Sequence, residues 1–175
     1  SAEEVMSSKE AFARAFKQAY LEQDPIAGRS LCQQHGDMFV TVNPPSLPLT
    51  TEQMDWVYSL PFTRKEHPHY KDGIKALEEV EYSITSHRGC FGSCSFCALT
   101  AHQGRLIQRR SLDSILAEAR LLTSLPGFKG IIHDIGGPTA NFHVASCARQ
   151  EERGACKGKQ CMSPDPCQKL NVDHT

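Results

Sequence analysis

Three cysteines within eight residues constrain this chain more than any other feature of its sequence. Cys90, Cys94 and Cys97 are separated by gaps of three and two residues, so one short loop brings three thiolates to a single compact site. Zinc usually takes a fourth protein ligand to complete its tetrahedron. Three cysteines instead hold three irons of a [4Fe–4S] cluster and leave the fourth iron open. The spacing favours an iron–sulfur cluster, with structural zinc and disulfides as alternatives.

The residues before this loop predict a β-strand. Residues 80–86 alternate apolar and polar side chains, which predicts a strand that buries Val80, Tyr82 and Ile84. The chain then enters the cysteine loop directly. Barrels of the α/β class place their chemistry just beyond the carboxyl ends of such strands.

A helix and a second strand are predicted after the loop. Ser111 is a suitable N-cap, and Pro126 with Gly127 ends the helix. The apolar stripe between them consists of Leu112, Ile115, Leu116, Ala119 and Leu122. Residues 130–135 predict a short strand that ends at Gly136 and Gly137. This order forms a βαβ unit, which implies a parallel strand pair.

The N-terminal part predicts three short elements. Residues 8–20 predict a packing helix, with an apolar stripe made of Phe12, Ala15, Phe16, Ala19 and Tyr20. Residues 38–42 are β-prone, and Thr50 or Thr51 would cap a short helix that continues to Tyr58. Residues 61–75 are predicted to be loop. Cys32 stands alone and is expected to be a buried hydrophobe.

The cysteine loop resembles that of a known superfamily. Cys90-x3-Cys94-x-Phe96-Cys97 is similar to the cluster loop of the radical S-adenosylmethionine (SAM) superfamily. Residues 87–97, the run His-Gln-Gly-Arg at 102–105 and the run Asp-Ile-Gly-Gly-Pro-Thr-Ala-Asn at 134–141 resemble the YgiQ-like family within it. The resemblance extends from about residue 43 to the last residue.

The resemblance implies roles for the residues that carry it. Cys90, Cys94 and Cys97 would be the cluster ligands. Phe96 would lie beside the adenine of SAM, and Gly136 with Gly137 would receive the SAM amino group. Catalytic residues are not assigned.

One position departs from the wider superfamily. Pro138 stands where many members have Glu, and proline offers neither a carboxylate nor an N–H. The YgiQ-like pattern has this proline, so we interpret it as a trait of that family.

The function implied by the resemblance is that of a radical SAM enzyme. Its cofactors would be a [4Fe–4S] cluster and SAM, and it would cleave SAM reductively to a 5′-deoxyadenosyl radical. Its partners would be an unidentified substrate and an electron donor such as a flavodoxin or a ferredoxin. The alternatives are a non-catalytic binding module stabilised by zinc or by a cluster, and a secreted domain stapled by disulfides.

Composition narrows the class of protein. With 39% hydrophobic and 22% charged residues, the chain has the composition of a globular protein. A formal net charge of −1 and a pI near 6.7 give no indication of nucleic-acid binding. No apolar run approaches the roughly 18 residues of a membrane span, and we expect a cytoplasmic protein because no signal peptide is recognised.

A second set of cysteines follows near the C-terminal end. Cys147, Cys156, Cys161 and Cys167 lie among Gly, Pro, Lys and Arg residues, in a segment with too little apolar content for a core of its own. Four thiolates suit zinc or an auxiliary [4Fe–4S] cluster equally, and free or disulfide-bonded thiols are the third alternative.

The predicted fold class is α/β. We expect the first βα units of a partial radical SAM barrel, incomplete in this fragment, with an irregular Cys-rich C-terminal segment. The expected boundaries are 1–79 for a helical linker region, 80–146 for the start of the core and 147–175 for the Cys-rich segment. From residue 90 to the end there are 86 residues, too few for a barrel of about 250 residues, so the isolated fragment is expected to be inactive.

Overall fold

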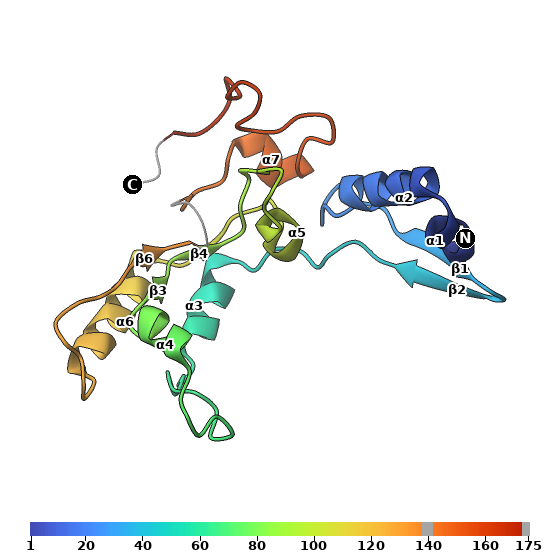
Figure 1. Ribbon diagram of the computed structural model, residues 1–175. Coiled ribbons are helices and arrows are strands. Elements are labelled where there is room, and N and C mark those ends of the chain that lie inside the picture. Colours follow the sequence, from blue (N-terminus) through green and yellow to red (C-terminus); the bar gives the residue numbers. More distant parts are fainter. Residues whose placement is uncertain (138–141, 173–175) are drawn as a thin grey trace. The chain divides into compact units, whose positions relative to one another are not determined.

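The computed structural model describes residues 1–137 and 142–172 (Figure 1). The chain divides into two compact units, and each is built from separate stretches of sequence. The described part of unit 1 comprises residues 1–48, 89–107 and 145–172, and that of unit 2 comprises residues 49–88, 108–137 and 142–144. None of the helices in these residues is long and apolar enough to cross a membrane.

Unit 1 combines short helices with one β-hairpin. Its elements are α1 (Ala2–Ser7), α2 (Lys9–Leu21), β1 (Leu31–His35), β2 (Met38–Val42), α5 (Leu99–Gln103) and α7 (Ala148–Arg153). β1 and β2 pair antiparallel, with Leu31 opposite Val42 and His35 opposite Met38. The expected strand at residues 38–42 is confirmed, while its partner β1 and the helices α5 and α7 were not predicted.

α2 confirms the expected helix but not the expected burial. The Ser8 hydroxyl caps it by accepting a hydrogen bond from the Ala11 amide, and Ala11 is its buried residue. Phe12 and Phe16 are both exposed, and their rings stack with centroids 6.4 Å apart. Cys32 is likewise exposed on β1, so its predicted burial is wrong.

Unit 2 holds a small α/β core. Its elements are α3 (Thr51–Ser59), α4 (Lys75–Val80), β3 (Ile84–Thr85), β4 (His87–Arg88), β5 (Gln108–Arg109), α6 (Leu112–Ser124) and β6 (Ile135–Gly136). β4 and β5 pair antiparallel. The hydrophobic core consists of Tyr82, Ile84, Ile115 and Leu122. α3 begins as expected, because Thr50 and Gln53 form a capping box.

The predicted parallel pair is confirmed, although both strands are shorter than expected. β3 pairs with β6 in parallel, Ile84 opposite Ile135 and Thr85 opposite Gly136. The strand predicted over residues 80–86 is wrong at its start, since α4 continues to Val80 and that side chain is exposed. Residues 75–79 favour a helix because Lys, Ala, Leu and Glu are strong helix formers. The structure therefore belongs to the α/β class in the coarse sense of mixed helices and small sheets.

The α6 helix buries a charged side chain inside its predicted apolar stripe. Ser111 caps the helix as expected, and Ile115 and Leu122 are buried. Leu112 and Leu116 are exposed, whereas Glu118 is buried and forms ion pairs with Arg64 and Arg110. The guanidinium of Arg110 lies 4.4 Å from the centroid of the Tyr58 ring, so this buried charge is both paired and stacked on an aromatic face.

Candidate functional site

The cysteine loop lies in unit 1, between β4 and α5. The Cys90 amide donates to the Gly104 carbonyl at 3.0 Å, and the Thr100 hydroxyl donates to the Cys90 carbonyl at 3.2 Å. Farther along, the Cys97 amide closes a turn on the Cys94 carbonyl at 3.0 Å. The backbone contacts of Cys90 thus anchor the start of the loop to α5 and the residues just after it.

The three cysteines of the loop differ in exposure. Cys90 is buried, Cys97 is half-buried and Cys94 is exposed, and none of them forms a disulfide. In residues 1–137 and 142–172, no three His, Cys, Asp or Glu side chains converge as a group that could hold a metal ion. Binding of a metal at this loop would therefore require the sulfurs of Cys94 and Cys97 to move towards the sulfur of Cys90.

Two residues of the loop have an unusual backbone conformation. Gly89 has a φ of +91°, and a Cβ there would lie 2.2 Å from the Leu106 carbonyl oxygen, so no other residue fits. Ser93 has a φ of +53°, which is uncommon for a non-glycine residue. Its buried hydroxyl has no hydrogen-bond partner among the described residues. Thiolate clusters take hydrogen bonds at sulfur, and this buried hydroxyl between two cysteines is suited to that role.

The glycine motif lies in unit 2, where Gly137 packs against His87. A Cβ at Gly137 would lie 2.0 Å from His87 Nε2. The His87 ring is fully buried, and its Nδ1 lies 2.9 Å from the Ser86 hydroxyl. His143 meets His87 edge to face with ring centroids 6.1 Å apart, and the buried Nε2 of His143 has no hydrogen-bond partner in the described part of the chain.

The remaining predicted residues have varied surroundings. Phe96 is 92% exposed and contributes to no hydrophobic core. Arg88 donates from Nε to the Tyr58 hydroxyl at 3.2 Å, and His102 is exposed on α5. Pro138 and Asn141 lie outside the described residues.

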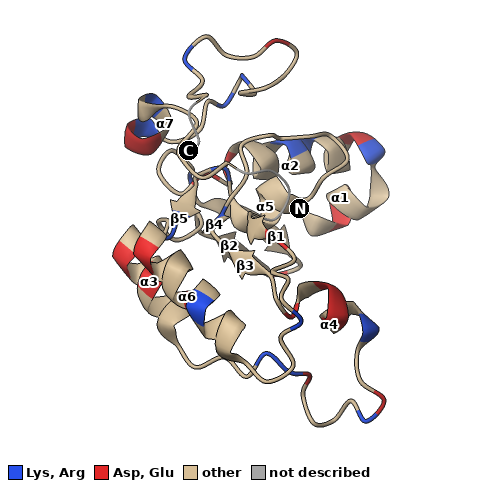
Figure 2. Cartoon of the chain, turned by 90° about the vertical axis from the view of Figure 1, so that its left-hand side faces the viewer, with Lys and Arg blue, Asp and Glu red and all other residues tan. Residues whose placement is uncertain are grey.

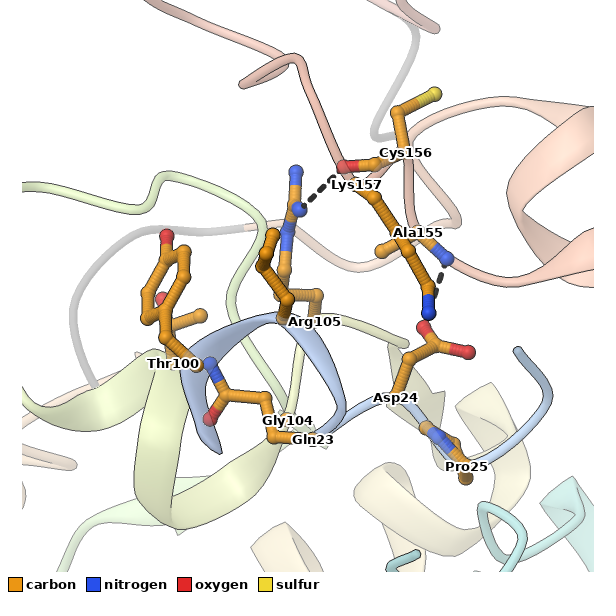
Figure 3. Close-up of a pocket in the computed structure, with 11 residues that line it drawn as sticks. Gln23, Asp24, Pro25, Thr100, Gly104, Arg105, Ala155, Cys156 and Lys157 are labelled. Carbon is orange, nitrogen blue, oxygen red and sulfur yellow. Dashed lines mark hydrogen bonds between the residues drawn. The ribbon is translucent and has the colours of Figure 1, made fainter. Parts of the chain in front are cut away.

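A pocket in unit 1 is lined by residues of α5, by the residues just after it and by Cys156 of the second cysteine set (Figure 3). Thr100, Gly104 and Arg105 line it together with Asp24 and Cys156. Arg105 donates from Nη1 to the Cys156 carbonyl at 3.2 Å and from Nη2 to the Cys161 sulfur at 3.8 Å. The side chain after the cysteine loop therefore contacts two of the four C-terminal cysteines.

Two buried carboxylates fix the chain on either side of Cys156. Asp24 Oδ2 accepts from the Ala155 amide at 2.7 Å, a contact drawn in Figure 3. Glu22 accepts from Lys157 Nζ at 2.8 Å and from the Arg29 guanidinium at 2.7 Å. These hydrogen bonds, with Arg29 first, lower the pKa of Glu22 to about 2.

Other cations lie beside the C-terminal sulfurs. Arg149 donates from Nη1 to the Cys156 sulfur at 2.9 Å. The backbone amide of Lys169, with the positive charge of Lys159 nearby, lowers the pKa of the Cys167 thiol. Figure 2 shows basic and acidic residues together on α7, the helix that carries Arg149.

Sequence reasoning missed several residues of these sites. Ser93, Thr100 and Glu22 gave no signal, because their roles depend on how the chain folds around them. The one available signal was at Asp24, which precedes a proline, and Asp-Pro favours a turn. Asp24 does hold that turn, since its Oδ1 accepts from the amides of Ile26 and Ala27.

This chain is similar to one family model and to several curated proteins. Residues 1–83 match the family model described as Radical SAM N-terminal. A UPF0313 protein of Clostridium botulinum (strain 657 / Type Ba4) is 56% identical over 176 aligned residues, which cover 99% of this chain and 28% of that protein.

Relatives from other organisms match in the same way. A UPF0313 protein of Methanocella arvoryzae is 56% identical over 98% of this chain and 28% of its own length. Another from Clostridium perfringens is 53% identical over 99% of this chain and 27% of its own length. This chain thus spans less than a third of the curated relatives it matches. No solved structure matches it.

Proposed function

Because this chain belongs to the radical SAM-related family that contains the UPF0313 proteins, we propose that its cysteine loop binds a [4Fe–4S] cluster and SAM within a longer enzyme. Cys90, Cys94 and Cys97 would hold three of the four irons. When bound, such a cluster would supply the electron that cleaves SAM reductively.

One observation carries this proposal. β3 and β6 are parallel, so the two chain segments that follow them leave from the same end of the pair. After β3 the chain runs through β4 into the cysteine loop, and Gly136 and Gly137 stand at the end of β6. Ligands of α/β folds bind outside the carboxyl ends of parallel strands, which supports a ligand site where this strand pair ends.

The chain's own residues would orient the cofactors. Gly137 exposes backbone rather than a side chain beside His87, in keeping with a contact to the SAM amino group. Ser93 would donate a hydrogen bond from its unpaired hydroxyl to a cluster sulfur. His143 would form a hydrogen bond through its unpaired Nε2 with a polar group of the ligand.

Reconstitution tests the proposal. The chain is reconstituted anaerobically with iron and sulfide, reduced, and examined by electron paramagnetic resonance with and without SAM. A cluster signal that changes on addition of SAM is expected. Cys94→Ala should remove that signal, whereas Cys32→Ala, a change at an exposed cysteine of β1, should leave it intact.

Other results would contradict the proposal. A cluster signal that does not respond to SAM would remove the SAM site and leave an electron-transfer or structural cluster. Stoichiometric zinc with no iron–sulfur absorbance would support the non-catalytic binding module instead.

A further inference from the structure

The four C-terminal cysteines lie in a segment of unit 1 that has no core of its own. From Cys156 to Val172 the structure has no helix or strand. Every residue of this stretch is half-buried or exposed. A segment of this kind needs another source of order to offset the conformational entropy that it loses on folding. Hydrogen bonds and cations gathered at the cysteines provide part of that order.

Backbone contacts connect these cysteines from both ends of the segment. The Cys167 amide donates to the Cys161 carbonyl at 2.9 Å. The Asn171 amide donates to the Ser146 carbonyl at 2.7 Å, and Ser146 directly precedes Cys147. The end of the segment therefore returns to its beginning, although Cys147 and Cys167 are far apart in sequence.

Arginine side chains complete the connection. Arg149, two residues after Cys147, donates to the Cys156 sulfur at 2.9 Å. Arg105 bridges Cys156 and Cys161 by donating to the carbonyl of one and to the sulfur of the other. Cys156, Cys161 and Cys167 thus share one network of contacts, which reaches Cys147 through its neighbours Ser146 and Arg149.

The surrounding charge suits deprotonated sulfur. Cys156 and Cys167 line a pocket together with Arg149, Lys159 and Lys169. Four thiolates around a divalent metal leave a net charge of −2, and neighbouring cations and N–H donors stabilise such a centre. Asp165 is the acidic residue that lines this pocket, so basic groups outnumber acidic ones there.

We propose that Cys147, Cys156, Cys161 and Cys167 form a second thiolate site, independent of the cysteine loop, that binds one thiophilic metal centre and thereby orders residues 145–172. The centre is either a zinc ion or an iron–sulfur cluster, both held through deprotonated sulfur. Each cysteine releases its thiol proton to solvent as its sulfur binds the metal.

Binding must also draw the sulfurs together. In the described residues no three ligating side chains already converge, so the backbone network would bring the cysteines near one another and the metal would complete the site. Coupling of metal binding to the ordering of a small segment is the usual behaviour of structural metal sites.

The test separates this site from the cysteine loop. A Cys90→Ser/Cys94→Ser/Cys97→Ser variant is reduced, incubated anaerobically with Zn²⁺, and analysed for bound metal after desalting. We expect about one zinc ion per chain, as for a four-cysteine structural site. A parallel sample with iron and sulfide shows by its absorbance whether a cluster is preferred. Adding Cys161→Ser and Cys167→Ser should abolish binding in both samples.

Two results would overturn the proposal. One is a loop variant that binds no metal in either sample, and the other is metal retained after loss of Cys161 and Cys167. Thiol alkylation of the unchanged chain gives a second measurement that does not depend on variants folding. Zn²⁺ should protect the four C-terminal cysteines, while Cys32 should react at the same rate with and without metal. Equal protection of Cys32 would contradict a specific site.

Discussion

Gly137 and Gly158 differ in the space that each leaves for a side chain. A Cβ at Gly137 would lie 2.0 Å from His87 Nε2, whereas a Cβ at Gly158 would meet nothing within 4 Å. Gly137→Ala should therefore force the buried His87 ring to move and lower the free energy of unfolding by about 1–3 kcal/mol, the usual cost of overpacking. Gly158→Ala is the matched control and should leave it nearly unchanged. Urea unfolding of both variants measures the difference, and equal stability would contradict the close packing of Gly137 on His87.

Glu22 gives unit 1 a dependence on pH. Its pKa is lowered to about 2 in the folded protein by Arg29 and Lys157, while the unfolded chain has the ordinary value of 4.5. Because the folded pKa is depressed, the stabilisation is present above pH 4.5 and is lost as the pH falls towards 2. Glu22→Gln should lower the free energy of unfolding at neutral pH. Between pH 5 and pH 2 the variant should lose less of that free energy than the parent protein does. An unfolding midpoint that falls as steeply with acid in the variant as in the parent would contradict this role.

At the scale of elements, the buried ion cluster of α6 should dominate the stability of unit 2. Glu118 pairs with both Arg64 and Arg110, and Arg110 is only 1% exposed. Burial lowers the pKa of both arginines, which shows the cost of keeping their charges away from water. Glu118→Ala leaves two cations unpaired and should cost about 3–5 kcal/mol of unfolding free energy.

A neighbour on the same helix provides the control for this prediction. Arg120 is exposed on α6, so Arg120→Ala should change stability by no more than about 0.5 kcal/mol. Thermal unfolding followed by circular dichroism compares the two variants. Similar melting temperatures would show that Glu118 does not stabilise unit 2.

The sequence predicted elements well where local signals were strong. Thr50 and Ser111 cap their helices as expected, because a capping hydroxyl acts on amides only two or three residues away. The parallel pairing of β3 with β6 also followed from the order of elements. These predictions needed no knowledge of distant contacts.

The remaining features depend on residues far apart in sequence. Glu118 lies beside an apolar stripe and is buried there because it pairs with Arg64. Arg64 lies 54 residues earlier, so periodicity alone gives no sign of that pair. Asp24 contacts Ala155 across 131 residues. The spacing of Cys90, Cys94 and Cys97 identified the candidate site, whereas the unpaired hydroxyl of Ser93 was visible only in the structure.

At the scale of the whole molecule, unit 1 is assembled from three separate stretches of the chain. Its last stretch, residues 145–172, supplies the partners of Asp24, Glu22 and Arg105. Removing that stretch leaves two buried carboxylates without part of their hydrogen bonds, and buried charges that lose partners are costly. We therefore expect a chain that ends at Val144 to loosen unit 1 selectively.

Hydrogen exchange measures this effect segment by segment. Amides of residues 22–29 and of α5 should exchange faster in the shortened chain, because Asp24, Glu22 and Arg105 have lost their C-terminal partners. Amides of α6 should keep their protection, because the core around Ile115 and Leu122 belongs to unit 2. Uniform loss of protection would mean that the two units unfold as one. Unchanged exchange throughout would mean that residues 145–172 contribute no order to the region that follows the cysteine loop.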